Sequence, residues 1–286
     1  MNYPKISIVT SSFNQGDYLE ETILSVLGQN YPNLEYIIID GGSTDNSVDI
    51  IRKHENQLAY WTSERDRGLY DALQKGFDKA TGDIMAYINS DDIYHRKSFY
   101  VVAEIFSKFT DVAWIMGLPS KIDEAGRIVS VAKYRPWSKY NYLQREYEWI
   151  QQESCFWRRR LWIQAGGKFA PALKYAGDFE LWSRFFSFAQ LYSLETVLGA
   201  FRTRTKDQLS VDRLGDYRAE VNAILDQRLK NLSSQEKVQL DKLWRYKNVY
   251  SKIPILRNRM RKYYQENLDY PAQIRFDRPS QSFVMA

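Results

Sequence analysis

The chain has 286 residues, of which 44% are hydrophobic and 26% are charged, and its formal net charge is +5. These values are typical of a globular protein with one large α/β domain, or with one such domain and an appendage. The N-terminal segment has no signal-peptide pattern and no apolar run approaches about eighteen residues, so we expect neither a signal peptide nor a membrane-spanning helix. Cys155 is the only cysteine, which excludes an intramolecular disulfide and gives no indication of an oxidising compartment.

Strands and helices are predicted to alternate through the first third of the chain, because apolar runs of strand length are separated by segments with helical spacing. We expect strands at residues 5–12, 34–40, 58–64 and 83–89, and helices at 18–27, 47–54 and 68–80. The strands are apolar on both faces and the connections are short. This pattern predicts a mostly parallel sheet covered by helices.

Polar residues follow each of the four predicted strands. Ligands of open parallel sheets bind at the carboxyl ends of the strands, so these residues are candidates for one common site. The polar and mostly acidic rim consists of Thr10, Ser11, Asn14, Asp40, residues 64–66 and residues 89–92.

The second half of the chain has a different pattern. Residues 111–123 and 127–137 are predicted to form antiparallel strands around a turn at 124–126. A helix is expected at 155–165, another opens near Asp178, and the final seventy residues are largely helical and charged.

Asp91 and Asp92 are adjacent acids at the end of a buried strand, where two negative charges repel each other. A divalent cation such as Mg²⁺ or Mn²⁺ takes oxygen ligands and is commonly held by one or two carboxylates together with substrate phosphates. The alternative is that the segment Ser90–Asp92 is a turn that caps the following helix, because Ser and Asp are favoured there. Both interpretations stay open on this stretch alone.

Other ligand sites find little support in the sequence. A dinucleotide-binding fingerprint needs three spaced glycines after the first strand, and residues 11–18 contain one. The glycines Gly41 and Gly42 follow the second strand, and no phosphate-binding loop with its lysine is present. His54 and His95 are the only histidines, which argues against a zinc site and against a histidine-dependent triad.

Three segments carry a resemblance to a known family. They are ISIVTSSFNQGDYLEETILSVLGQNYPNLEYIIIDGGSTDNS, then SERDRGLYDALQKGFDKATGDIMAYINSDD, then GGKFAPALKYAGDFELWSRF. In this order and spacing, residues 5–210 resemble the family 2 glycosyltransferases with the GT-A fold, especially bacterial enzymes that build cell-surface polysaccharides. The resemblance implies an α/β fold with a GT-A domain at 1–210, divided into a nucleotide-binding half (1–95) and an acceptor half (96–210). Residues 211–286 then form a helical C-terminal extension.

The resemblance also implies a function. The enzyme would move a hexosyl or N-acetylhexosaminyl group from a nucleotide-diphosphate donor, by default a UDP-sugar, to a glycan or a lipid-linked acceptor. Inverting transfer, a Mn²⁺ or Mg²⁺ cofactor and a cytoplasmic location follow from the same resemblance. The alternative from another class is a non-catalytic nucleotide-sugar-binding protein on the same fold. Carried over to this sequence, the residues that would contact the nucleotide are Thr10, Phe13, Asn14, Asp40 (base), Asp66 and Gly68 (base and ribose), and Ser90.

The acidic residues receive individual roles from the resemblance. Asp91 would contact ribose and metal, and Asp92 would be the principal metal ligand. Asp178 matches the catalytic base, which takes the proton of the acceptor hydroxyl as this oxygen attacks the anomeric carbon. Because Asp178 begins a helix, we expect the dipole to keep its pKa low. The alternative is that Asp178 only caps the helix.

Several further residues have open roles. Gln152 and Glu153 fall in the acceptor region of the family, or form a simple polar loop. Related sequences often carry a histidine in the segment that corresponds to residues 201–210, and this chain has none. Arg202, Arg204 or Lys206 would bind the diphosphate in its place, or would be solvated surface charge.

Residues 242–263 contain eight basic side chains and no acidic one, with aromatic and aliphatic residues between them. Such a segment can lie on an anionic membrane surface, which predicts peripheral contact with the inner face of the plasma membrane. The alternative is a solvated helical appendage, for example a contact between two copies of a homodimer, and Pro254 interrupts any long helix. A nucleic-acid partner is not expected, because no reader motif accompanies the charge.

Overall fold

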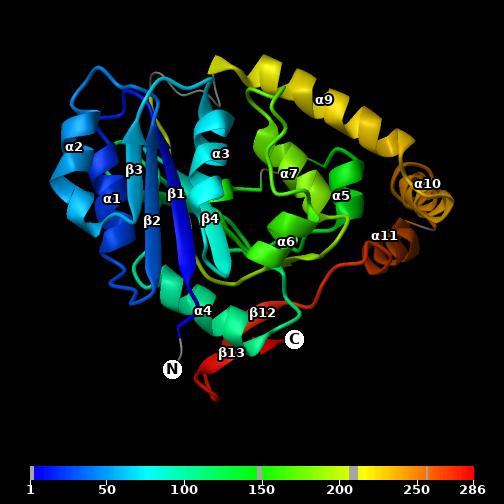
Figure 1. The fold of residues 1–286 in the computed structure, drawn as a ribbon. Helices are drawn as coiled ribbons and strands as arrows, with labels where there is room; N and C mark the ends of the chain where they lie inside the picture. The colour runs from blue at the N-terminus through cyan, green and yellow to red at the C-terminus, as the bar shows by residue number, and fades with distance from the viewer. Residues whose placement is uncertain (1–2, 147–149, 206–211, 256) are drawn as a thin grey trace.

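The computed structural model describes residues 3–146, 150–205, 212–255 and 257–286. A seven-stranded sheet with the order β10-β6-β9-β4-β1-β2-β3 forms its centre (Figure 1). β4, β1, β2 and β3 are parallel, whereas β9 is antiparallel to both β4 and β6. The strands are β1 (Ile6–Ser12), β2 (Leu34–Asp40), β3 (Tyr60–Ser63), β4 (Ile84–Asn89), β6 (Trp114–Met116), β9 (Cys155–Arg158) and β10 (Leu191–Ser193). The predicted mostly parallel α/β sheet is therefore confirmed.

Helices cover the sheet because its strands are apolar on both faces. Every residue of β1 is buried, so neither face of this strand tolerates water. α3 packs closely on β1, since a Cβ atom at Gly76 would lie 2.4 Å from the Val9 side chain. The helices of this region are α1 (Leu19–Leu27), α2 (Ser47–His54), α3 (Leu69–Lys79), α4 (Ser98–Lys108), α5 (Lys139–Leu143), α6 (Arg159–Gln164) and α7 (Gly177–Phe185).

A second sheet has the order β5-β11-β7-β8. Its strands are β5 (Ile93–Tyr94), β7 (Ser120–Ile122), β8 (Ile128–Val131) and β11 (Gly199–Arg202). β7 and β8 are antiparallel, as predicted for the two segments around the turn at 124–126. The sheet brings β11 beside β5, which directly follows the acidic pair after β4.

The helix predicted at 155–165 is wrong in its first part. Residues 155–158 form the strand β9 and not the first turn of a helix, and α6 begins only at Arg159. Cys155, Phe156 and Trp157 are fully buried between β4 and β6, so tertiary packing decides their conformation.

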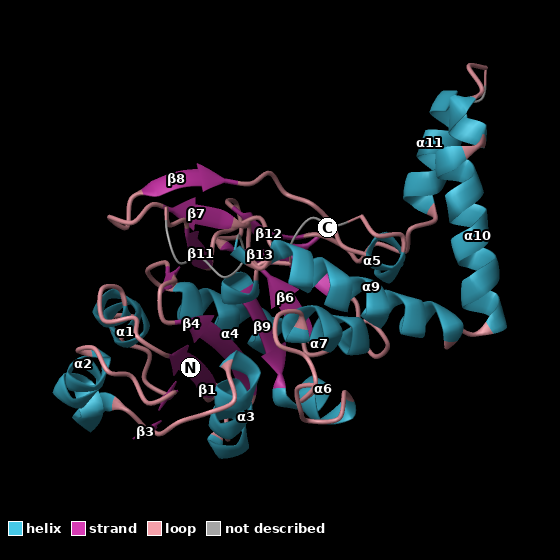
Figure 2. Ribbon diagram, turned by 90° about the horizontal axis from the view of Figure 1, so that it is seen from above, coloured by secondary structure: helices cyan, strands magenta, loops and turns pink. Residues whose placement is uncertain are grey.

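The C-terminal extension begins with three helices, as predicted, namely α9 (Leu214–Lys230), α10 (Ser234–Asn248) and α11 (Arg257–Glu266). It ends in a hairpin of β12 (Ile274–Asp277) and β13 (Ser282–Met285), which the sequence did not indicate. Ile274 bridges to Leu194 at the end of β10, so the hairpin is joined to the main sheet. In contrast, α10 and α11 stand away from the body of the protein (Figure 2). None of the helices in the described ranges combines the length and apolar character needed to cross a bilayer.

Candidate active site

The loops after β1 and β2 meet at one edge of the sheet and are tied together by Asn14. The backbone N–H of Asn14 donates to Ser43 Oγ at 2.8 Å, and Asn14 Oδ1 accepts from the N–H of Thr44 at 2.8 Å. Phe13 beside it is 58% exposed and is available to a ligand. Thr10 is instead fully buried, with its hydroxyl 3.1 Å from that of Tyr36. The side chain of Thr10 therefore points into the core, and the place of Thr10 in the nucleotide pocket stays a prediction.

Asp40 also lies inside the protein. Its carboxylate accepts hydrogen bonds from the N–H groups of Gly42 and Ser43, at 3.1 and 2.9 Å, and from the hydroxyls of Ser43 and Ser63, at 2.5 and 2.6 Å. The side chain is fully buried, so it fixes the turn after β2. This arrangement does not agree with the predicted direct contact between Asp40 and the base.

Asp66 presents a half-buried carboxylate at the same edge. A Cβ atom at Gly41 would lie 2.8 Å from Asp66 Oδ2, so the carboxylate of Asp66 can occupy this position because residue 41 has no side chain. Oδ1 of Asp66 accepts from the N–H of Gly68 at 2.8 Å. Gly68 has a φ of 112°, a conformation that favours glycine, and it precedes the first residue of α3. Both predicted nucleotide residues of this loop therefore lie at the site edge.

The two acids after β4 have different surroundings. Asp92 is fully buried, with Oδ1 accepting from the N–H of Arg202 at 2.9 Å and Oδ2 from Gln152 Nε2 at 3.2 Å. Burial raises the pKa of Asp92 well above its ordinary value, and the neighbouring carboxylates of Asp91 and Glu153 add to this rise. Asp91 keeps 16% of its side chain exposed, and its Oδ2 lies 3.1 Å from Arg204 Nη2. Ser90 beside them is buried.

Arg202 holds the loop with the acidic pair in place. Its fully buried guanidinium donates to the carbonyl of Asp91 at 2.6 Å, to those of Asp123 and Glu124 at 3.0 Å, and to Glu21 Oε2 at 2.6 Å. A side chain with these partners serves the architecture of the site, so the option of direct diphosphate binding by Arg202 is wrong. Arg204 is the arginine at the carboxylate of Asp91, and Lys206 lies outside the described residues.

Gln152 and Glu153 do not form an exposed polar loop, because both are buried. Gln152 contacts Asp92 directly. Burial raises the pKa of the Glu153 carboxyl to about 8, and the charge of Asp91 contributes to this rise. The two residues therefore support the acidic pair from within the protein, and the sequence did not indicate this contact.

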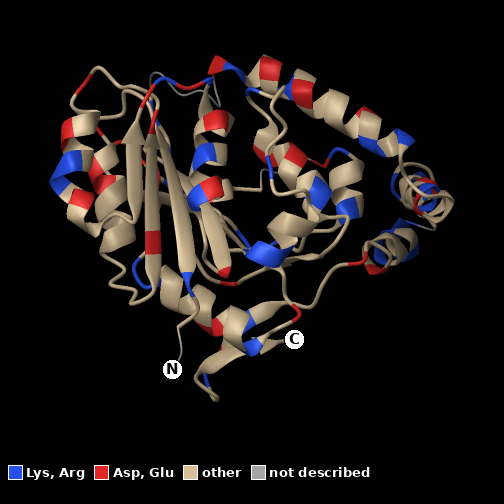
Figure 3. Cartoon of the chain, in the orientation of Figure 1, with Lys and Arg blue, Asp and Glu red and all other residues tan. Residues whose placement is uncertain are grey.

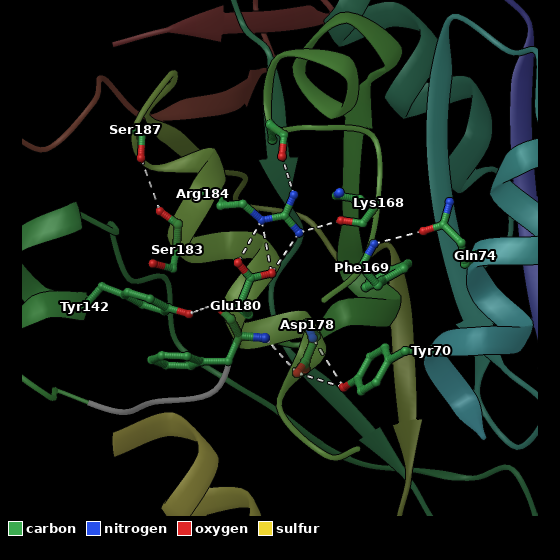
Figure 4. A network of polar contacts seen from close by, with 12 residues as sticks. Tyr70, Gln74, Tyr142, Lys168, Phe169, Asp178, Glu180, Ser183, Arg184 and Ser187 are labelled. Atoms are coloured by element: carbon green, nitrogen blue, oxygen red, sulfur yellow. Dashed lines mark hydrogen bonds and ion pairs between the residues drawn. The ribbon is translucent and has the colours of Figure 1, made fainter. Parts of the chain in front are cut away.

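Asp178 lies at the start of α7 and faces Tyr70 of α3 (Figure 4). Its Oδ1 accepts from the Tyr70 hydroxyl at 3.2 Å and from the N–H of Phe179 at 2.7 Å. Burial raises the pKa of Asp178 to about 6, although both hydrogen bonds act in the opposite direction. The expectation of a low pKa is wrong, because the loss of hydration outweighs the favourable helix terminus.

The neighbours of Asp178 on α7 have structural roles. Glu180 forms an ion pair with Arg184 at 2.8 Å, and Arg184 also donates to the carbonyl of Lys168 at 2.7 Å (Figure 4). Trp182 and Phe185 are buried in the core. Asp178 is thus the carboxylate of this helix that remains for chemistry.

Glu220 of α9 is a residue of the site that the sequence did not indicate. Its carboxylate accepts from three consecutive backbone N–H groups that precede α7, those of Lys174, Tyr175 and Ala176, at 2.8–3.0 Å. The N-terminal turn of α7 is thereby fixed from the C-terminal extension. Spacing in the sequence gives no signal for this contact, because its partners are backbone groups.

The oxygen-rich surroundings of Asp91 suit a hard divalent cation, but they provide few protein ligands for it. No three His, Cys, Asp or Glu side chains come together as a metal-binding group in the described ranges. Both oxygens of Asp92 already accept hydrogen bonds, so the prediction of Asp92 as the principal ligand fits this geometry poorly. The residues present fit a cation that is held by Asp91 and otherwise by substrate phosphates.

Known proteins resemble the chain in sequence and in structure. An uncharacterized glycosyltransferase of Mycobacterium tuberculosis is 43% identical over 90 residues, which cover 31% of this chain and 34% of the relative. TuaG of Bacillus subtilis, a putative teichuronic acid biosynthesis glycosyltransferase, is 37% identical over 96 residues, which cover 32% of this chain and 38% of TuaG. The matches thus span about a third of the length of these curated relatives.

The fold has a solved counterpart in TarS of S. aureus, in a crystal structure of residues 1–349 in complex with UDP-GlcNAc. The TM-score is 0.67 at 18% identity, and the match covers 92% of this chain and 81% of the other. At this identity the likeness concerns the fold alone. The profile of glycosyl transferase family 2 matches residues 7–165, more than half of the chain, and the chain therefore belongs to this family, with its GT-A fold.

Proposed function

We propose that the protein transfers a sugar from a nucleotide-diphosphate donor to an acceptor hydroxyl in the synthesis of a cell-surface polysaccharide. The observation that carries this proposal is Asp178, a half-buried carboxylate whose pKa lies near 6 and whose position is fixed by Tyr70 and by the start of α7. The name of TuaG supports a polysaccharide product, and the UDP-GlcNAc bound to TarS supports a UDP-sugar as donor. The acceptor is a glycan or a lipid-linked sugar.

In the proposed reaction, Asp178 acts as general base in a single displacement. The acceptor oxygen attacks the anomeric carbon, its proton passes to Asp178, and the bond between this carbon and the diphosphate oxygen breaks. The diphosphate leaves with the bonding electron pair, and no covalent intermediate with the enzyme is needed. With a pKa near 6, Asp178 is ionised at neutral pH and is basic enough to accept the proton.

At the donor end, Asp91 and Arg204 are the groups we assign to the diphosphate, and Asp66 and Phe13 those we assign to the nucleoside. A divalent cation would neutralise the charge that develops on the leaving diphosphate. Asp91 is the proposed protein ligand of this cation, because it keeps an exposed edge. Asp92 would act by fixing the loop through Arg202 and Gln152.

A binding screen and two variants test the proposal. Nucleotide sugars are compared by thermal shift with Mn²⁺ and with EDTA, because a ligand that binds the folded state raises its melting temperature. We expect a UDP-sugar to stabilise the protein more with Mn²⁺, and D91N to lose this metal effect. D92N, which leaves the proposed ligand intact, serves as the matched control and should retain it.

Turnover of the donor identified in the screen is then measured for the wild type and for D178N. We expect D178N to bind the donor with unchanged affinity and to lose at least about 100-fold in transfer rate, the usual contribution of a general base. Turnover of D178N near that of the wild type would place the base elsewhere. Donor binding without any turnover by the wild type would favour the alternative of a non-catalytic binding protein.

A further inference from the structure

The helices α10 and α11 form an antiparallel hairpin, and α10 contacts the body near its start, where Glu236 pairs with Lys139 at 3.0 Å. Near the body, Tyr264 is buried and its hydroxyl donates to Glu146 Oε1 at 2.6 Å, and Lys247 pairs with the same carboxylate. The rings of Tyr246 and Tyr263 lie 4.5 Å apart and join the two helices. The connection between the helices is at the far end, which projects away from both sheets (Figure 2).

The eight basic residues predicted as one group fall into two sets. Four of them have partners within the hairpin or its base: Lys242 lies over the ring of Tyr263, Arg245 pairs with Asp241, Lys247 pairs with Glu146, and Lys262 lies 3.7 Å from Glu266. The other four are exposed, and none of them forms an ion pair within the described ranges. They are Lys252, Arg257, Arg259 and Arg261, which lie in the connection between the helices and in the first half of α11, a helix that carries many basic residues (Figure 3).

Apolar side chains are exposed at the same end. Ile255 is 95% exposed and Ile253 is 41% exposed, on the two sides of Pro254. Such side chains gain nothing from water, and no carboxylate of the described residues pairs with the cations beside them. We define the hairpin tip as the six residues Lys252, Ile253, Ile255, Arg257, Arg259 and Arg261.

We propose that the hairpin tip docks on an anionic phospholipid surface. The apolar side chains would enter the boundary between head groups and acyl chains, and the basic side chains would contact the phosphates. A nucleic acid would satisfy the cations but would leave the exposed isoleucines without a role. A second protein copy would have to supply acidic residues opposite the cations. The combination of cations with exposed aliphatic residues therefore fits a charged bilayer best.

Vesicle flotation with the full chain tests this proposal and does not depend on catalytic activity. We expect binding to phosphatidylcholine vesicles that contain phosphatidylglycerol, little binding to phosphatidylcholine alone, and loss of binding in high salt. Each cation near such a surface contributes about fivefold to the partition coefficient, so the quadruple variant K252Q/R257Q/R259Q/R261Q should bind about 600-fold more weakly. The matched control removes four exposed cations from the body, as R52Q/K79Q/R96Q/R159Q, and should bind within about threefold of the wild type.

A fluorescent probe tests the insertion of the aliphatic residues. Cys155 is the only cysteine and is fully buried, and burial raises the pKa of its thiol well above the ordinary value, so it reacts slowly. I255C can therefore be labelled selectively with an environment-sensitive dye. We expect a blue shift of its emission with anionic vesicles and none for I163C, which replaces an exposed isoleucine of α6.

Three results would overturn the proposal. The first is an absence of vesicle binding by the wild type, and the second is equal weakening in the control variant, which would show a general charge effect. The third is binding to an oligonucleotide, or self-association in sedimentation velocity, that depends on the four hairpin cations while vesicle binding does not. Thermal unfolding of each variant verifies that the fold is retained.

Discussion

Asp178 should reduce the stability of the folded protein at neutral pH, and removal of its charge should reverse this effect. The rise of its pKa from 3.8 to about 6 corresponds to at most about 3 kcal/mol, at about 1.4 kcal/mol for each pH unit. The variant D178N has nearly the same shape and still accepts the hydrogen bond from the N–H of Phe179. D178N therefore differs from the wild type in that no charge is buried at this position.

The sign of the effect follows from proton binding. Between pH 3.8 and about 6 the folded wild type binds more protons at Asp178 than the unfolded chain does, so its stability decreases as the pH rises through this range. D178N lacks this dependence. We therefore expect D178N to be more stable than the wild type by up to about 3 kcal/mol at pH 8, and by no more than about 1 kcal/mol at pH 4.5.

Urea denaturation followed by tryptophan fluorescence measures this difference at the two pH values. D49N is the control, because the Asp49 side chain is 79% exposed and its replacement removes one charge without relieving burial. A D178N effect of equal size at pH 4.5 and pH 8, or a loss of stability at pH 8, would refute the assignment of a buried, ionised carboxylate to this position.

Two further predictions concern the surroundings of Asp178. In Y70F the loss of a hydrogen bond to the carboxylate should move the midpoint of the ascending pH–rate profile upward from about 6 by roughly half to one pH unit. Y142F, which loses a bond to the carbonyl of Phe179 and none to Asp178 that the structure shows, should leave the midpoint in place. Identical profiles for Y70F and the wild type would contradict this role of Tyr70. In E220A three backbone N–H groups lose their acceptor, so the free energy of unfolding should fall by about 2 kcal/mol and the transfer rate should fall more than the donor affinity. D216A on the same helix should have little effect on stability or rate. An E220A variant as stable and active as the wild type would refute this role of Glu220.

The sequence was sufficient for the architecture of the first half, because each strand and helix there has its own periodicity. β1, β2, α2 and β4 lie within a residue of their predicted ranges. β9 was missed because its four residues are too few to show the periodicity of a strand. Its conformation is instead fixed by pairing with β4 on one side and β6 on the other. The terminal hairpin of β12 and β13 was missed for a similar reason, since its packing against β10 is a long-range contact.

The site was predictable at the level of regions but not of individual side chains. The carboxyl ends of β1, β2 and β4 do carry the polar rim, yet Thr10 and Asp40 point inward. Which of two adjacent acids is accessible depends on Arg202, which lies 110 residues after Asp92 and buries it. The pKa of Asp178 depends on burial against Tyr70 from another helix, and a helix-terminus argument alone predicts the opposite direction.

Glu220 links the C-terminal extension to the helix that carries Asp178. It follows the predicted domain boundary at residue 210 by ten positions, yet it accepts hydrogen bonds from the backbone that leads into the helix of the proposed base. A protein shortened at that boundary would keep every residue assigned to the donor and to proton transfer. It would nevertheless lose the acceptor for three N–H groups beside Asp178. The extension therefore belongs to the framework that holds the proposed base, and the two segments cannot be exchanged independently between relatives without rebuilding this contact.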